Sequence, residues 1–158
     1  MISPLYAANN MIRRASEQEV NLTNLKLQKL LYLLYARYYI DAKVSLFPDR
    51  FEAWKYGPVL TEIYDIFKKE GADPIVDMRP NANGDTFVVS ETGAFGASFD
   101  FVWGNYARKS ASYLVGLTHG DEDPGYTTAW KKAVEDGGIG SFMKDSDIQK
   151  DGEHWFGE

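Results

Sequence analysis

Histidine is the side chain best suited to acid–base or metal chemistry near neutral pH, and this chain has two, His119 and His154. His119 is closely followed by Asp121, Glu122 and Asp123, which could bind a cation or orient the imidazole ring. Metal sites, however, usually show two or more ligands at a recognisable spacing. The second histidine, His154, is not at such a spacing from His119, because it stands near the end of the chain. We therefore interpret His119 as the end of a helix, where its charge is favourable for the helix dipole. An enzyme that uses His119 with the neighbouring carboxylates is the alternative interpretation.

Other patterns typical of catalysis are missing. The chain has no cysteine, which excludes disulfides, thiolate catalysis and cysteine-ligated zinc. Two serines precede His119, but there is no Gly-x-Ser-x-Gly elbow, and proximity in sequence does not make a triad. The carboxylates of Asp145, Asp147 and Asp151 stand in sequence typical of solvent-exposed positions. The sequence thus predicts no catalytic residue, no metal and no cofactor.

The strongest candidate for binding is the run WKYGP at residues 54–58, which packs two aromatic side chains, a cation and a Gly-Pro corner into five residues. Trp and Tyr are favoured anchors of protein interfaces, so Trp54 and Tyr56 are predicted to edge a partner groove. The structural interpretation, which the pattern favours slightly over the functional one, is that both aromatics anchor an irregular loop onto the central helix. The predicted partner-binding residues are these two aromatics together with Lys26, Lys29 and His119.

The element that must position these residues is the stretch 22–40, LTNLKLQKLLYLLYARYYI. Its apolar residues recur at spacings of three and four and also cover the opposite side, which is typical of a buried helix. Thr23 is the expected N-cap, and Lys26, Lys29 and Arg37 are expected to reach out to solvent by their long stems. The longest charge-free run, residues 30–36, is far shorter than the roughly 20 residues that a membrane span needs.

The rest of the chain predicts shorter helices and one small hairpin. Helices are expected at residues 4–16, 58–71, 90–109, 110–119 and 126–136, with a last turn at 146–150. The β-like run TFVVS at 86–90 follows the turn signal Asn83-Gly84 and is expected to pair with 75–78. The prediction is a mainly α (α-rich α+β) fold: a single compact helical domain over residues 1–158, built around the buried central helix.

The charge of the chain limits its partners. The formal net charge is −6, which disfavours nucleic acid as a partner, because affinity for nucleic acid comes largely from basic side chains. Residues 1–55 nevertheless carry a net charge of +3 against −9 for residues 56–158. A DNA-binding autorepressor therefore stays open as an alternative, although no clear helix-turn-helix is present. No secretory signal or membrane segment is recognisable, so a cytoplasmic protein is expected.

Three blocks together resemble a known family. NLTNLKLQKLLYLLYARYYI at 21–40, FEAWKYGPVLTEIY at 51–64 and SASYLVGLTHGDEDPGYTTAW at 110–130 are similar, in this order, to the Panacea domain of SocA-like antitoxins, which are often associated with phages. In the interval 123–129 the chain departs from the family's closer Pro-Trp spacing, which affects the expected role of Trp130.

The resemblance implies a non-enzymatic protein that binds and neutralises a cognate toxin, usually encoded beside it, by direct protein–protein contact. One branch of the family delivers its toxin to a Clp-type protease. A phage-encoded interaction protein or proteolytic adaptor is therefore a further alternative.

Overall fold

The computed structural model describes residues 1–157; Glu158, the last residue of the predicted domain, lies outside the described residues. The described chain forms mostly helices, with one two-stranded antiparallel sheet, which confirms the mainly α fold class. The α-helices are α1 (Pro4–Gln18), α2 (Asn24–Ala42), α3 (Thr61–Phe67), α4 (Gly93–Tyr106), α5 (Ala111–His119), α6 (Ala129–Gly137) and α7 (Asp145–Phe156), with a 3-10 turn η1 (Lys68–Glu70) and strands β1 (Glu52–Trp54) and β2 (Gly57–Val59).

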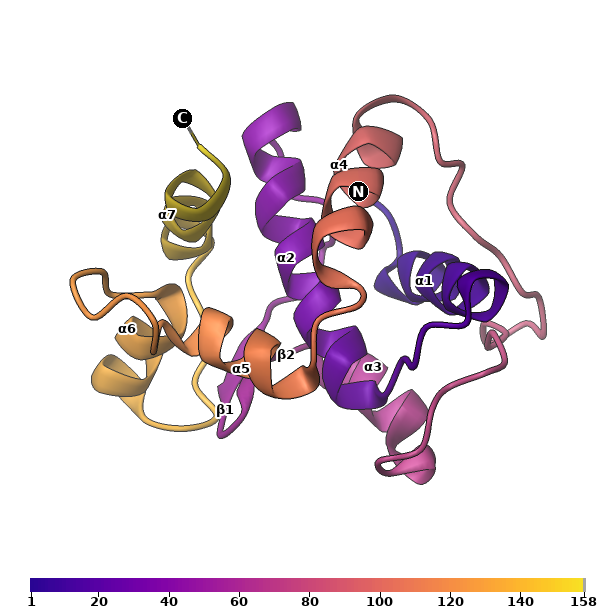
Figure 1. The fold of residues 1–158 in the computed structure, drawn as a ribbon, viewed down its shortest axis with the longest axis horizontal. Helices are drawn as coiled ribbons and strands as arrows, with labels where there is room; N and C mark the ends of the chain where they lie inside the picture. Colours follow the sequence, from indigo (N-terminus) through magenta and orange to yellow (C-terminus); the bar gives the residue numbers. More distant parts are fainter. Residues whose placement is uncertain (158) are drawn as a thin grey trace.

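Helix α2 runs through the middle of the molecule, with α4 on one side and α7 on the other (Figure 1). Thr23 caps it as predicted, because the backbone N–H of Lys26 donates to Thr23 Oγ1 at 3.3 Å. All residues from 30 to 36 are buried, and α1, α3, α5 and β2 also pack against this helix. The predicted buried central helix is confirmed.

The hairpin exists, but its predicted position is wrong. It lies at β1 and β2, where Trp54 pairs with Gly57 across a two-residue turn. The other edge of β1 is covered by the segment before α7, since Ala53 N–H donates to Ser141 O at 2.8 Å. Pro58 therefore belongs to β2 and does not begin a helix, and α3 starts only at Thr61.

The predicted strands at 75–78 and 86–90 are not strands, because side chains of α1 take the place of a strand partner. Asn9 Nδ2 donates to Arg79 O and Phe87 O at 3.0 and 2.9 Å. Asn10 Nδ2 donates to Val89 O at 2.8 Å, and Val89 N–H donates back to Asn10 Oδ1 at 2.7 Å. Two buried amides thus satisfy alternate peptide groups of an extended segment without a sheet.

The C-terminal segment also differs from the prediction. The expected single turn at 146–150 is part of α7, which continues to Phe156 and packs along α2. Within residues 1–157, no helix combines the length and hydropathy that crossing a bilayer requires.

Candidate partner-binding groove

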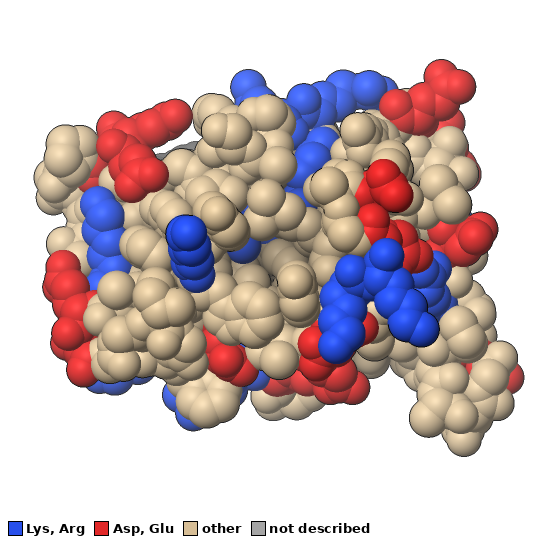
Figure 2. Space-filling model, turned by 90° about the horizontal axis from the view of Figure 1, so that it is seen from below, with Lys and Arg blue, Asp and Glu red and all other residues tan. Residues whose placement is uncertain are grey.

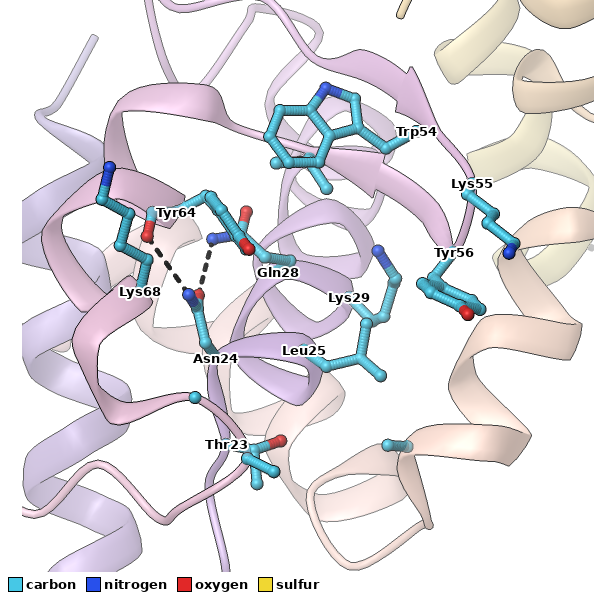
Figure 3. Close-up of a pocket in the computed structure, with 14 residues that line it drawn as sticks. Thr23, Asn24, Leu25, Gln28, Lys29, Trp54, Lys55, Tyr56, Tyr64 and Lys68 are labelled. Carbon is cyan, nitrogen blue, oxygen red and sulfur yellow. Dashed lines mark hydrogen bonds between the residues drawn. The ribbon is translucent and has the colours of Figure 1, made fainter. Parts of the chain in front are cut away.

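A groove of about 640 Å³ opens beside α2, between the hairpin, α3 and the start of α5 (Figure 3). Figure 2, which views the molecule from below, shows a hollow near the middle of this face, with Lys or Arg side chains to its left and right and Asp or Glu side chains beside those on the right. The apolar lining includes Leu25 and Val59, together with the aromatic rings of Trp54, Tyr56 and Tyr64. This size and composition are typical of sites that bind a ligand or a partner's side chains.

The aromatic side chains that line the groove differ in how firmly their rings are held. The rings of Trp54 and Tyr64 meet edge to face with centroids 4.9 Å apart, and Trp54 Nε1 donates to Glu52 Oε1 at 3.2 Å. Tyr56 lies in the hairpin turn and is 56% exposed. Trp54 is therefore a fixed wall, whereas the ring of Tyr56 is exposed to solvent.

A chain of amide hydrogen bonds holds α3 and the hairpin against α2 (Figure 3). Asn24 Nδ2 donates to Tyr64 O at 3.2 Å, and Gln28 Nε2 donates to Asn24 Oδ1 at 3.1 Å. Leu60 N–H donates to Gln28 Oε1 at 3.0 Å, so the backbone is fixed directly before α3 begins. The amides at the groove floor are thus engaged in holding its walls.

Lys29 lies beneath the hairpin and is fully buried, although the sequence predicted that it would reach solvent. Its Nζ donates to Pro58 O at 2.8 Å, and it forms no ion pair with any carboxylate in residues 1–157. Burial lowers the pKa of Lys29 to about 7, because desolvation disfavours the charged form. An amine so far from its ordinary pKa is a signal of a functional site when it adjoins a groove.

Gly57 makes room for this lysine. A Cβ at this position would lie 2.9 Å from Lys29 Cε and 3.0 Å from Thr118 Oγ1, and its φ of +108° disfavours any side chain. Gly57→Ala is expected to lower the free energy of unfolding by about 2–3 kcal/mol, from backbone strain and overpacking together. Urea unfolding measures this change.

Gly84→Ala is the matched control for that prediction, since Gly84 also has a positive φ, +87°, but no atom within 4 Å of the added Cβ. Gly84→Ala introduces backbone strain without overpacking, so it is expected to lower the free energy of unfolding by less than Gly57→Ala does. Equal losses in the two variants would show that the space beside Lys29 is not required.

His119 lies behind the hairpin and outside the groove lining. Its ring stacks on Trp130 with centroids 3.9 Å apart, and Trp130 Nε1 donates to Trp54 O at 2.7 Å. Burial lowers the pKa of His119, with the nearby Asp121 opposing this effect. His119 thus supports the strand that carries Trp54, and it ends α5 as predicted.

The carboxylates after His119 do not converge on its ring. Asp121 Oδ2 is 3.7 Å from His119 Nδ1 and largely exposed, whereas Asp123 instead pairs with His154 at 2.7 Å. No group of three or more acidic, histidine or cysteine side chains in residues 1–157 is arranged to hold a metal ion.

Lys26 is also withdrawn from solvent, contrary to the prediction. Its Nζ donates to Ala107 O at 2.7 Å, after α4 and away from the groove lining. Burial lowers its pKa, with a smaller contribution from Arg108. Of the five predicted residues, the groove therefore brings together Lys29, Trp54 and Tyr56, with His119 behind them and Lys26 elsewhere.

Asp151 is a further buried ionisable group, and the prediction that it is solvent-exposed is wrong. It accepts hydrogen bonds from Tyr32 Oη at 2.6 Å, Tyr126 Oη at 2.7 Å and the backbone N–H of Ala129 at 3.1 Å. Burial raises the pKa of Asp151, and these donors oppose that effect. Because its oxygens are occupied by three protein donors, this carboxylate ties α7 to α2 and to the start of α6.

Sequence reasoning missed Asn24, Gln28, Tyr64 and Lys68 as groove residues. One signal was available: Asn24 and Gln28 stand one turn apart on a helix that is otherwise largely apolar. Polar side chains in such a setting need buried partners. Tyr64 and Lys68 carried no comparable signal, because their places depend on how α3 packs.

Comparisons with known proteins bear on the class of this helical protein. A family model described as "Antitoxin SocA-like, Panacea domain" matches residues 27–124. The chain is 31% identical over 122 residues to the Antitoxin SocA of Caulobacter vibrioides (strain NA1000 / CB15N), a match that covers 74% of this chain. The chain spans 65% of the length of that curated relative. No solved structure matches the present chain.

The chain thus belongs, by its sequence, to the class of antitoxin-like proteins. In particular, it is a member of the SocA-like family defined by the Panacea domain. The matched region begins at Leu27 within α2 and takes in the hairpin, α3, α4 and α5, and so includes most of the groove.

Proposed function

We propose that this protein neutralises a cognate toxin by binding it directly through the groove face, without catalysing a reaction. Its family supports an antitoxin role, and the relative from Caulobacter is itself named an antitoxin. The single observation that carries the proposed contact surface is the groove itself, which places an exposed Tyr56 beside a fixed Trp54.

The chemistry of the groove supports binding by complementarity. A fixed aromatic wall and an exposed tyrosine are the residue types that dominate binding energy at protein interfaces. Lys29 adds a buried amine beneath them, and His119 fixes the strand through Trp130. We assign contact to Trp54 and Tyr56, an electrostatic contribution to Lys29 and a supporting role to His119.

The arrangement around His119 favours contact over catalysis. One face of its ring is covered by Trp130, its Nε2 is buried, and of the adjacent acidic side chains Asp121 lies 3.7 Å from Nδ1 whereas Asp123 pairs with His154. A general base must be within hydrogen-bond reach of its substrate. We therefore propose that the protein is not an enzyme and that a toxin is its partner.

The test is co-expression with candidate toxins encoded by the flanking genes, followed by measurement of growth and of complex formation. The wild-type chain is expected to restore growth and to co-purify with one toxin. Tyr56→Ala is expected to weaken the complex about tenfold or more, because an interface tyrosine typically contributes 1–2 kcal/mol or more. Phe142→Ala is the matched control, since Phe142 is equally exposed, at 54%, but lies outside the groove.

Three outcomes would contradict the proposal. Growth rescue without any physical complex would exclude neutralisation by contact, and a fall in toxin level that requires a Clp-type protease would indicate a proteolytic adaptor. Equal weakening by Tyr56→Ala and Phe142→Ala would remove the groove from the interface.

A further inference from the structure

The charged side chains that line the groove are of one sign, whereas Asp65 and Glu52 lie just outside the lining, beside Lys68 and Trp54. Apart from tyrosines, the ionisable side chains that line the groove are Lys29, Lys55 and Lys68. No carboxylate is among the lining residues. The chain as a whole has 23 Asp and Glu residues against 17 Lys and Arg. A basic cleft on an acidic protein concentrates positive potential at that cleft and attracts anionic partners to it.

Each lysine is available to an anion in a different way. Lys55 is exposed in the hairpin turn, with its Nζ 5.4 Å from the ring centroid of Tyr56. Lys68 lies 3.9 Å from Asp65, and both side chains are more than half exposed, so this pair contributes little and Lys68 can change partner. Lys29 lies below the floor, where its Nζ donates a hydrogen bond to Pro58 O at 2.8 Å.

The polar groups of the floor select against other partners. The amides of Asn24 and Gln28 are bonded to each other and to the backbone of Tyr64 and Leu60. A basic partner segment would thus meet the exposed ammonium groups of Lys55 and Lys68 at the lining, which is a repulsive element of the kind that gives specificity. Between the lysines, the surfaces of Leu25, Val59 and the aromatic rings are apolar.

We infer that the groove receives an acidic segment of the protein partner, with an apolar side chain against the aromatic walls and carboxylates facing Lys55 and Lys68 above the buried Lys29. This inference rests on the proposed function and specifies the chemistry of the toxin segment that is bound. The apolar contact supplies affinity, and the charges supply orientation and a faster association.

The first experiment measures association of the purified toxin with two double variants. Lys55→Gln/Lys68→Gln removes two cations from the groove, whereas Lys43→Gln/Lys150→Gln removes two exposed cations elsewhere. The groove variant is expected to associate about tenfold more slowly at low salt, with a weaker salt dependence, since charges at a rim act mainly on the association rate. The control variant is expected to stay within about twofold of the wild-type chain. Equal effects of the two variants would overturn the inference.

The second experiment does not need a toxin. A displayed library of random 12-residue peptides is selected on the wild-type chain, with Lys55→Gln/Lys68→Gln as the counter-selection. Enrichment of peptides that combine Asp or Glu with aromatic or aliphatic residues supports the inference; enrichment of neutral or basic peptides, or no enrichment, overturns it. If no toxin complex forms in the first experiment, the proposed function fails, and the peptide selection still decides which chemistry the groove accepts.

Discussion

Replacement of Asp151 by alanine is expected to lower the free energy of unfolding by about 3 kcal/mol. The substitution leaves the hydroxyls of Tyr32 and Tyr126 and the N–H of Ala129 without their acceptor. A buried donor without a partner costs about 1–3 kcal/mol. Part of this loss is offset, because removing a buried carboxylate also removes its desolvation penalty. In a chain of this length, the loss corresponds to a melting temperature lower by about 6–12 °C.

Thermal and urea unfolding check this value against two other variants. Asp151→Asn keeps an acceptor oxygen and removes the charge, so its loss is expected to be about 1 kcal/mol. Glu153→Ala, an exposed position on the same helix, is expected to stay within about 0.5 kcal/mol of the wild-type chain. If Asp151→Ala were as mild as Glu153→Ala, the three hydrogen bonds would not hold α7 in place.

The elements that could be predicted from sequence are those whose signals are local. The all-round apolar pattern of 22–40 identifies α2, and the hydroxyls of Thr23 and Ser110 mark the first turns of α2 and α5, where each accepts a backbone N–H. Such patterns depend on residues within one or two turns of each other. They survive in the folded chain because packing reinforces them.

The position of the hairpin could not be predicted in this way, because tertiary contacts decide which of two candidate segments forms the strands. TFVVS has the stronger β pattern, yet Asn9 and Asn10 of α1 take up the backbone groups of Phe87 and Val89. The segment around Trp54 pairs because Gly57 accepts the turn and residues near Ser141 cover the outer edge of β1. Neither fact is visible within a short window of sequence.

The candidate site was predictable in part for the same reason. Trp54 and Tyr56 stand out by residue type, and both line the groove. The burial of Lys29 and Asp151 could not be predicted, because charged residues are almost always exposed unless they are paired. Their places depend on Pro58 O and on two tyrosine hydroxyls that come from distant parts of the chain.

The buried Lys29 is expected to make stability depend on pH in a way that Lys29→Met removes. In the folded chain its pKa is about 7, against an ordinary value of 10.5. Between pH 7 and pH 10.5 Lys29 therefore binds more protons in the unfolded chain than in the folded chain, so its contribution to stability rises with pH across this interval. At and below pH 7, the folded chain carries a penalty of about 4–5 kcal/mol from this one side chain. By pH 10 most of the penalty has disappeared.

Lys29→Met exchanges this penalty for a smaller, constant loss. The methionine fills a similar volume but leaves Pro58 O without its donor, which costs about 1–3 kcal/mol. At pH 7 the variant is expected to be about 2 kcal/mol more stable than the wild-type chain, and at pH 10 about 1 kcal/mol less stable. His119, whose pKa is lowered by burial, is present in both chains, so its effect cancels in the difference between them.

Urea unfolding at pH 7, 8, 9 and 10 measures the difference between the two chains, with Lys55→Met as the control for loss of an exposed lysine. The difference for Lys29→Met is expected to change sign across the series, whereas that for Lys55→Met stays constant. Parallel curves for all three chains would show that Lys29 keeps its ordinary pKa in the folded state. A variant that is more stable at pH 7 but binds its partner less well would show that the charge beneath the groove is maintained for binding at a cost to the fold.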